Sequence, residues 1–149
     1  KIEEKINESI KDSMKKKDNL RLDSLRAIKS AILIEKTKSG SKDHIEESVI
    51  FKILQNMVKQ RNDSAKIYLE QKRDELANDE ISQANIISEF LPAQLSYSDL
   101  SEIIDKVIID IGADSMKDMG KVISGVTERV SGQAEGRLIA EIVKRKLMS

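Results

Sequence analysis

Apolar residues recur every three or four positions along almost the whole chain, and a single proline, Pro92, interrupts them. This spacing matches the 3.6 residues per turn of an α-helix, whereas a half-buried strand would alternate apolar and polar residues. The sequence therefore predicts an all-α protein without a sheet. With 149 residues and 39% hydrophobic side chains the chain can bury a core, and with only 3% aromatic residues that core must be aliphatic.

The proline also predicts where the chain divides, because a residue without a backbone N–H ends regular helix. We expect an N-terminal helical domain over residues 1–91, with about four helices of which one is long, and a three-helix tail domain over residues 92–149. The expected helices are residues 2–17, a segment from Leu22 to a turn at Gly40, about thirty residues after Asp43, residues 81–91, 96–111, 115 to a stop at Gly132, and about 134–147.

Three predicted helix starts carry a capping pair, in which an N-cap side chain and an acidic side chain three residues later satisfy free backbone N–H groups. The pairs are Asp43 with Glu46, Ser96 with Asp99, and Ser115 with Asp118. They predict the starts of the third, fifth and sixth helices.

Five of the six glycines lie between residues 112 and 136. Gly112 and Gly132 follow predicted helices, where glycine adopts the left-handed conformation at least cost. Gly120 and Gly125 lie inside a predicted helix, where each costs roughly 1 kcal/mol relative to alanine. Two explanations are open: a neighbouring helix packs closely there, or an external partner such as a phosphate backbone approaches the bare main chain.

The distribution of charge favours an anionic partner. The chain as a whole is neutral, with 26 basic and 26 acidic residues, but residues 92–114 carry one base against five acids and residues 115–149 carry seven bases against four acids. A basic surface with accessible amides suits contact with phosphate groups. We therefore predict a contact surface made of Lys117, Gly120, Lys121, Gly125, Gly132, Gly136 and Arg137.

No catalytic or metal site is predicted. The chain has no cysteine, and its one histidine, His44, is expected to be an exposed residue of a first helical turn. The acidic pairs Glu46–Glu47 and Asp79–Glu80 are expected in first turns of helices, where carboxylates favour the helix dipole.

No cofactor is predicted either. The segment GKVISG at residues 120–125 is not a phosphate-binding P-loop, because Gly and Lys stand in the wrong order and no strand precedes them. The chain has no apolar run of membrane-spanning length and no cysteine, so we expect a soluble protein of a reducing cytoplasm.

Two charged sets on helices have structural as well as functional interpretations. Lys59, Arg61 and Lys66 form a polar patch on the long third helix, either a solvated face or a surface for a partner. Arg137, Glu141 and Arg145 are spaced four residues apart and are expected to pair along the last helix.

Several stretches together resemble the YqeY family. They are RLDSLRAIKSAI at residues 21–32, Lys59-Gln60-Arg61 with Ser64 and Tyr68, then Arg73, Leu76, Ala77 and Glu80, FLPAQLS at residues 90–96, and SMKDMGKVISGVTERVSGQAEGRL at residues 115–138. The resemblance implies an all-helical, two-part protein. It also implies that the tail is similar to the C-terminal domain of the B subunit of glutamyl/aspartyl-tRNA amidotransferase, a domain associated with tRNA binding.

The chain departs from the family pattern at two places in the tail. Residues 126–129 are VTER where many members carry Met and Pro, which places an acid, Glu128, near the predicted basic face. Residues 132–136 are GQAEG where a Gly-Arg/Lys-Ala-Asp-Gly turn is common, so one positive charge is lost.

These observations lead to a functional prediction with two alternatives. The principal hypothesis is a non-catalytic binding module that associates with tRNA through its tail. The first alternative is an accessory component of tRNA-dependent amidation that acts together with catalytic amidotransferase subunits. The second is a protein–protein adaptor whose long third helix is the interface.

Overall fold

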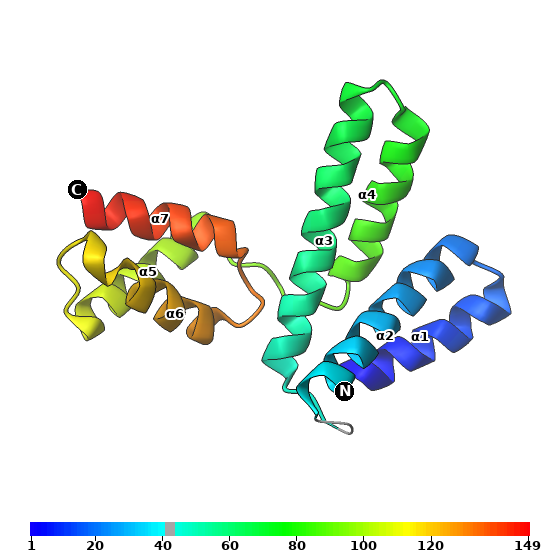
Figure 1. The fold of residues 1–149 in the computed structure, drawn as a ribbon, viewed down its shortest axis with the longest axis horizontal. Helices are drawn as coiled ribbons and strands as arrows, with labels where there is room; N and C mark the ends of the chain where they lie inside the picture. The colour runs from blue at the N-terminus through cyan, green and yellow to red at the C-terminus, as the bar shows by residue number, and fades with distance from the viewer. Residues whose placement is uncertain (41–43) are drawn as a thin grey trace. The chain divides into compact units, whose positions relative to one another are not determined.

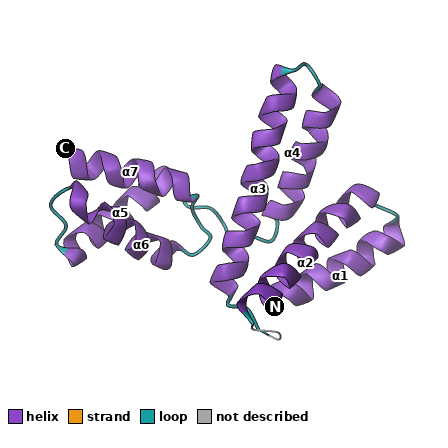
Figure 2. Cartoon of the chain, viewed as in Figure 1, coloured by secondary structure: helices purple, strands orange, loops and turns teal. Residues whose placement is uncertain are grey.

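The computed structural model describes residues 1–40 and 44–149. In this part of the chain the backbone forms seven α-helices and one short 3-10 turn, with no strand, which confirms the all-α prediction (Figures 1 and 2). The chain divides into two compact units, Lys1–Leu91 and Pro92–Ser149. None of the described helices combines the length and hydropathy needed to cross a membrane.

The first unit consists of two helical hairpins. Its helices are α1 (Ile2–Lys16), α2 (Asn19–Ser39), α3 (Glu47–Glu70) and α4 (Asp74–Ser88). Helix α2 packs against α1 and also against α3 and α4, so it joins the two hairpins (Figure 1). The aliphatic core between them is made of Ile6, Leu25, Ile28, Ile32, Ile45, Ile50, Leu54, Met57 and Ile87.

The boundary between α3 and α4 differs from the prediction. Helix α3 has 24 residues and ends at Glu70, and α4 begins at Asp74 rather than at Ile81. The chain reverses through Lys72, which has a φ of 61°, so neither glycine nor proline marks the break. The start of α4 was missed because its first two turns bury only a small residue, Ala77, instead of a large apolar side chain.

Two further predictions for this unit concern acidic residues at the starts of α3 and α4. Asp79 and Glu80 lie in the second turn of α4, not the first, whose acidic residues are Asp74 and Glu75. Asp43, the first member of a predicted capping pair, lies outside the described residues. Its predicted partner Glu46 is itself the N-cap of α3 and makes no side-chain capping hydrogen bond.

The second unit is a three-helix domain with one additional turn. Its elements are α5 (Tyr97–Ile111), η1 (Met116–Asp118), α6 (Met119–Val130) and α7 (Gly136–Met148). Its separate core consists of Leu100, Ile104, Val107, Val122, Val126, Val130, Ala134, Ile139, Ile142 and Val143. Both cores lack aromatic residues among their fully buried side chains, as the composition predicts.

One of the predicted caps in the second unit forms and the other does not. Ser96 Oγ accepts a hydrogen bond from the Asp99 N–H at 3.1 Å, which confirms the predicted start of α5. Ser115 precedes η1 instead of an α-helix, and its buried Oγ has no hydrogen-bond partner among the described groups. Helix α7 begins at Gly136, later than predicted, because Ala134 is buried in the core and belongs to the connecting loop.

Candidate nucleic-acid interface

Helix α6 presents an apolar face to the core and a basic face to solvent. Val122, Val126 and Val130 are buried, and this spacing of four residues lines one side of the helix. Lys117, Gly120 and Lys121 are exposed on η1 and the first turn of α6. We call these three residues the α6 basic face.

The two glycines of α6 have different surroundings. A Cβ built on Gly125 would lie 3.0 Å from Val107 Cγ1 and 3.4 Å from Ile111 Cδ1, so α5 packs closely against this point. A Cβ built on Gly120 would meet nothing within 4 Å. Close helix packing therefore accounts for Gly125, whereas at Gly120 the backbone is open and packing gives no reason for the missing side chain.

The glycines around the last loop also differ. Gly132 has a φ of 82°, a left-handed conformation that follows the end of α6 and that other residues adopt only with strain. Gly136 is exposed at the first position of α7 with open space around its Cα, and Arg137 next to it is exposed.

The predicted surface is divided between the two ends of α6. Helix α7 packs against both α6 and η1, and it runs back along α6 so that its C-terminal end lies near η1 (Figure 1). The α6 basic face is at this end, whereas Gly132, Gly136 and Arg137 are at the other. From Lys121 to Val130, the last residue of α6, the helix rises about 14 Å.

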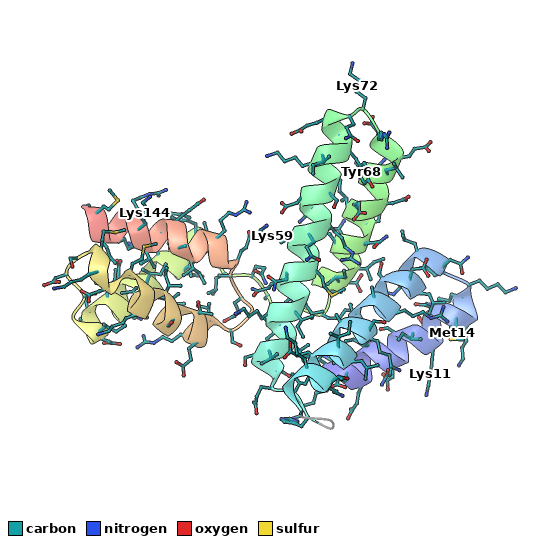
Figure 3. The ribbon with its side chains drawn as sticks, viewed as in Figure 1. Lys11, Met14, Lys59, Tyr68, Lys72 and Lys144 are labelled. Atoms are coloured by element: carbon teal, nitrogen blue, oxygen red, sulfur yellow. The ribbon has the colours of Figure 1, made fainter. Side chains whose placement is uncertain are left out.

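The antiparallel arrangement adds a residue that the predicted surface does not include. Lys144 is exposed on α7 (Figure 3), toward the end of that helix that lies near η1. Sequence spacing cannot place Lys144 beside the α6 basic face, because 23 positions separate it from Lys121.

Residues 115–149 contain seven basic residues, and three of them make intramolecular contacts through their side chains. Arg129 pairs with Asp110 at 2.6 Å and Lys146 pairs with Asp105 at 2.8 Å. Arg145 donates a hydrogen bond to Tyr97 Oη at 2.6 Å.

The predicted pairing of Arg137, Glu141 and Arg145 is wrong, since no ion pair joins them in the described structure and Arg145 turns to α5 instead. Among the described residues 115–149, the basic side chains that make neither an ion pair nor a side-chain hydrogen bond are Lys117, Lys121, Arg137 and Lys144.

The patch predicted on α3 is largely engaged within its own unit. Lys59 pairs with Asp63 one turn later at 2.8 Å. Arg61 Nε donates to Gln83 Oε1 at 3.0 Å and so joins α3 to α4. Lys66 is exposed, and Figure 3 shows Lys59 on the same helix. Arg61 therefore has a structural role that the sequence pattern does not reveal.

The described residues contain no group of three or more His, Asp or Glu side chains arranged to hold a metal ion. His44 is exposed, as predicted, but it lies two residues before the N-cap of α3 instead of in its first turn. Its Nε2 is 3.5 Å from Glu46 Oε1. This is an exposed pair at the surface, not a ligand cluster.

Comparison with known families decides the relationship of this chain. The model of the family described as "Yqey-like protein" matches residues 3–147, nearly the whole chain. The chain belongs to the YqeY family. This YqeY-family protein thus carries the family pattern through both of its compact units.

Among curated proteins, the YqeY-family chain is similar to fungal proteins named "Altered inheritance of mitochondria protein 41, mitochondrial". The protein of Clavispora lusitaniae is 36% identical over 98 residues, which cover 66% of this chain and 55% of the relative. Those of Candida glabrata and Kluyveromyces lactis are 29% and 28% identical over 86 and 88 residues, 58% and 59% of this chain and 47% of each relative. The chain spans about half the length of the curated relatives it matches.

Proposed function

We propose that this YqeY-family protein is a non-catalytic binding module that associates with tRNA through its tail. One observation carries the proposal: Lys117 and Lys121 are exposed, lack acidic partners among the described residues, and lie beside the bare backbone of Gly120. Two ammonium groups next to an accessible main chain suit the phosphate backbone of a nucleic acid.

The tail is suited to recognising phosphates and shape more than bases. The tail has a single aromatic residue, Tyr97, whose hydroxyl accepts a hydrogen bond from Arg145, so it offers few of the aromatic platforms on which single-stranded bases stack. Folded RNA is recognised largely through backbone contacts and shape. A structured RNA such as tRNA is therefore a better partner for the α6 basic face than an unpaired strand.

Binding of the full-length chain to an unfractionated tRNA pool at two salt concentrations tests the proposal. Wild-type protein is compared with Lys117→Glu, Lys121→Glu. A matched control, Lys11→Glu, Lys15→Glu, makes the same charge change on the exposed face of α1 (Lys11 in Figure 3). Circular dichroism verifies that all three proteins are folded.

The proposal expects salt-sensitive binding that the tail variant loses and the α1 variant keeps. Each phosphate contact contributes about 0.7 to 0.9 to the slope of log affinity against log salt. Equal loss in both variants would show that only net charge matters, and no binding of the wild type at low salt would refute the tRNA proposal.

A protein–protein adaptor is a second candidate, because α3 exposes Ile67 and Leu69 at 53% and 50%. Binding of a partner through such apolar side chains would resist added salt, in contrast to phosphate contacts. Amidotransferase subunits are one class of partner that a pull-down would test.

The proposal also includes the cellular compartment in which the protein acts. A cytoplasmic location remains a prediction, and the curated relatives carry the word mitochondrial in their names.

A further inference from the structure

The side chain of Gln94 bridges two distant carbonyl groups. Its Nε2 donates hydrogen bonds to Pro92 O and to Gly132 O, each at 2.9 Å. A primary amide nitrogen carries two N–H groups, so both donors of Gln94 are used. The bridge joins the segment before α5 to the loop between α6 and α7, 38 residues apart.

A second bond lies next to this bridge. The Leu95 N–H donates to Gln133 O at 2.9 Å, so consecutive carbonyls of the loop, those of Gly132 and Gln133, accept from consecutive residues, Gln94 and Leu95. Leu95 also packs against the core of the second unit. Segment 92–95 is therefore anchored to the core through Leu95 and hydrogen-bonded to the loop through Gln94 and Leu95.

The loop itself is tied to α6 through its N–H groups. Ser131 N–H donates to Thr127 O at 3.0 Å and Gln133 N–H donates to Val130 O at 2.8 Å. Gly132 between them has the left-handed φ of 82°, and Ala134 after them is buried. The loop is thus bound to α6 through the N–H groups of Ser131 and Gln133, and to segment 92–95 through the carbonyls of Gly132 and Gln133. These hydrogen bonds fix the backbone path between Val130 and the start of α7.

We propose that Gln94 is a positioning residue that fixes the α6–α7 loop and thereby sets where Arg137 meets the phosphates of the RNA. The inference rests on the proposed function, because it assigns Gln94 a part in the same surface. In this proposal Gln94 acts through the loop, because both of its amide donors are bound to the carbonyls of Pro92 and Gly132. Glutamine suits the role, since glutamate has no donor for the two carbonyls and asparagine is shorter by one methylene.

The first experiment measures the loop without RNA. Gln94→Met keeps the approximate length of the side chain and removes both donors, while Gln60→Met makes the same change at an exposed site on α3. We expect amide hydrogen exchange at Leu95 and Gln133 to become about tenfold faster in Gln94→Met only. Unchanged exchange at these amides would overturn the inference.

The second experiment measures coupling in tRNA binding. Gln94→Met should weaken binding about three- to tenfold in the wild-type and Lys121→Ala backgrounds, and have little further effect in the Arg137→Ala background. A general loss of stability would weaken binding equally in the Lys121→Ala and Arg137→Ala backgrounds, so equal losses in these two backgrounds would overturn the positioning role.

The two proposals fail in distinguishable ways. If the wild-type protein binds no tRNA, the proposed function falls and the binding role of Gln94 falls with it. If the wild type binds and Gln94→Met binds equally well, only the positioning role is refuted.

Discussion

Gly125 on α6 lies directly against Val107 on α5, so that a Cβ on the glycine would come within 3.0 Å of Val107 Cγ1. Val107 is buried and β-branched, so its side chain has little freedom to move away. Gly120, five residues earlier on the same helix, faces open space. Both glycines lie within the same helical pattern in the sequence, but in the fold a Cβ would be crowded at Gly125 and has open space at Gly120.

Alanine should therefore affect stability differently at these two positions. Gly120→Ala removes a glycine from a helix without a steric conflict and should raise the free energy of unfolding by about 0.5 to 1 kcal/mol. Gly125→Ala should lower it, because the added methyl overpacks a buried contact at a cost of about 1 to 3 kcal/mol. Urea unfolding followed by circular dichroism measures both, and an equal stabilisation would contradict the packing explanation.

The two serines predicted to cap helices should also respond differently. Ser96 Oγ accepts the Asp99 N–H, so Ser96→Ala should destabilise the protein by about 1 kcal/mol. Ser115 Oγ is buried without a partner among the described groups, so Ser115→Ala should be neutral or stabilising. Thermal unfolding of both variants tests this, and a larger loss for Ser115→Ala would reveal a hydrogen bond that the structure lacks.

The basic residues of α6 should contribute unequally to RNA binding. Arg129 pairs with Asp110, and its charge is partly neutralised, whereas Lys121 has no acidic partner. We expect Lys121→Gln to weaken binding to tRNA more than Arg129→Gln and to lower the salt slope by about 0.7 to 0.9. Titration of the tRNA pool at several salt concentrations compares them. An equal change in slope would show that Arg129 leaves Asp110 to contact phosphate.

The Arg21–Glu89 ion pair should make the stability of the first unit depend on pH. Two hydrogen bonds of 2.9 Å from Arg21 hold the pKa of Glu89 below its usual range, against the opposing effect of burial. A carboxylate with a lowered pKa in the folded state contributes stability above its unfolded pKa, and this contribution is lost as pH falls through the folded pKa.

Glu89→Gln should accordingly lie below the wild type in stability at neutral pH and approach it in acid. The difference should stay below about 1 kcal/mol, because the Glu89 side chain is 51% exposed and solvent screens the pair. Urea unfolding at several pH values between neutral and acid measures it. A difference independent of pH would show that the charge of Glu89 does not contribute.

Much of the fold followed from local pattern. The three- and four-residue spacing predicted helices throughout, and the Ser96 cap predicted the start of α5. The break between α3 and α4 did not follow, because it depends on Lys72 in a left-handed conformation and on Ala77, which the packing of two helices buries completely. Local preference alone does not favour either feature.

The sequence by itself determined the helical class and the aliphatic cores, since these depend on composition and on residues within a few turns of one another. It also determined the membership in the YqeY family, since the family pattern matches residues 3–147. Only the tertiary structure decided that Gly125 is packed while Gly120 is open, that Arg129 is paired while Lys121 is not, and that Gln94 holds the loop at Gly132. The reason is physical: these properties depend on the tertiary surroundings of each residue, such as the contacts of Gly125, Arg129 and Gln94 with residues 14 to 38 positions away, and such surroundings exist only after the helices have packed.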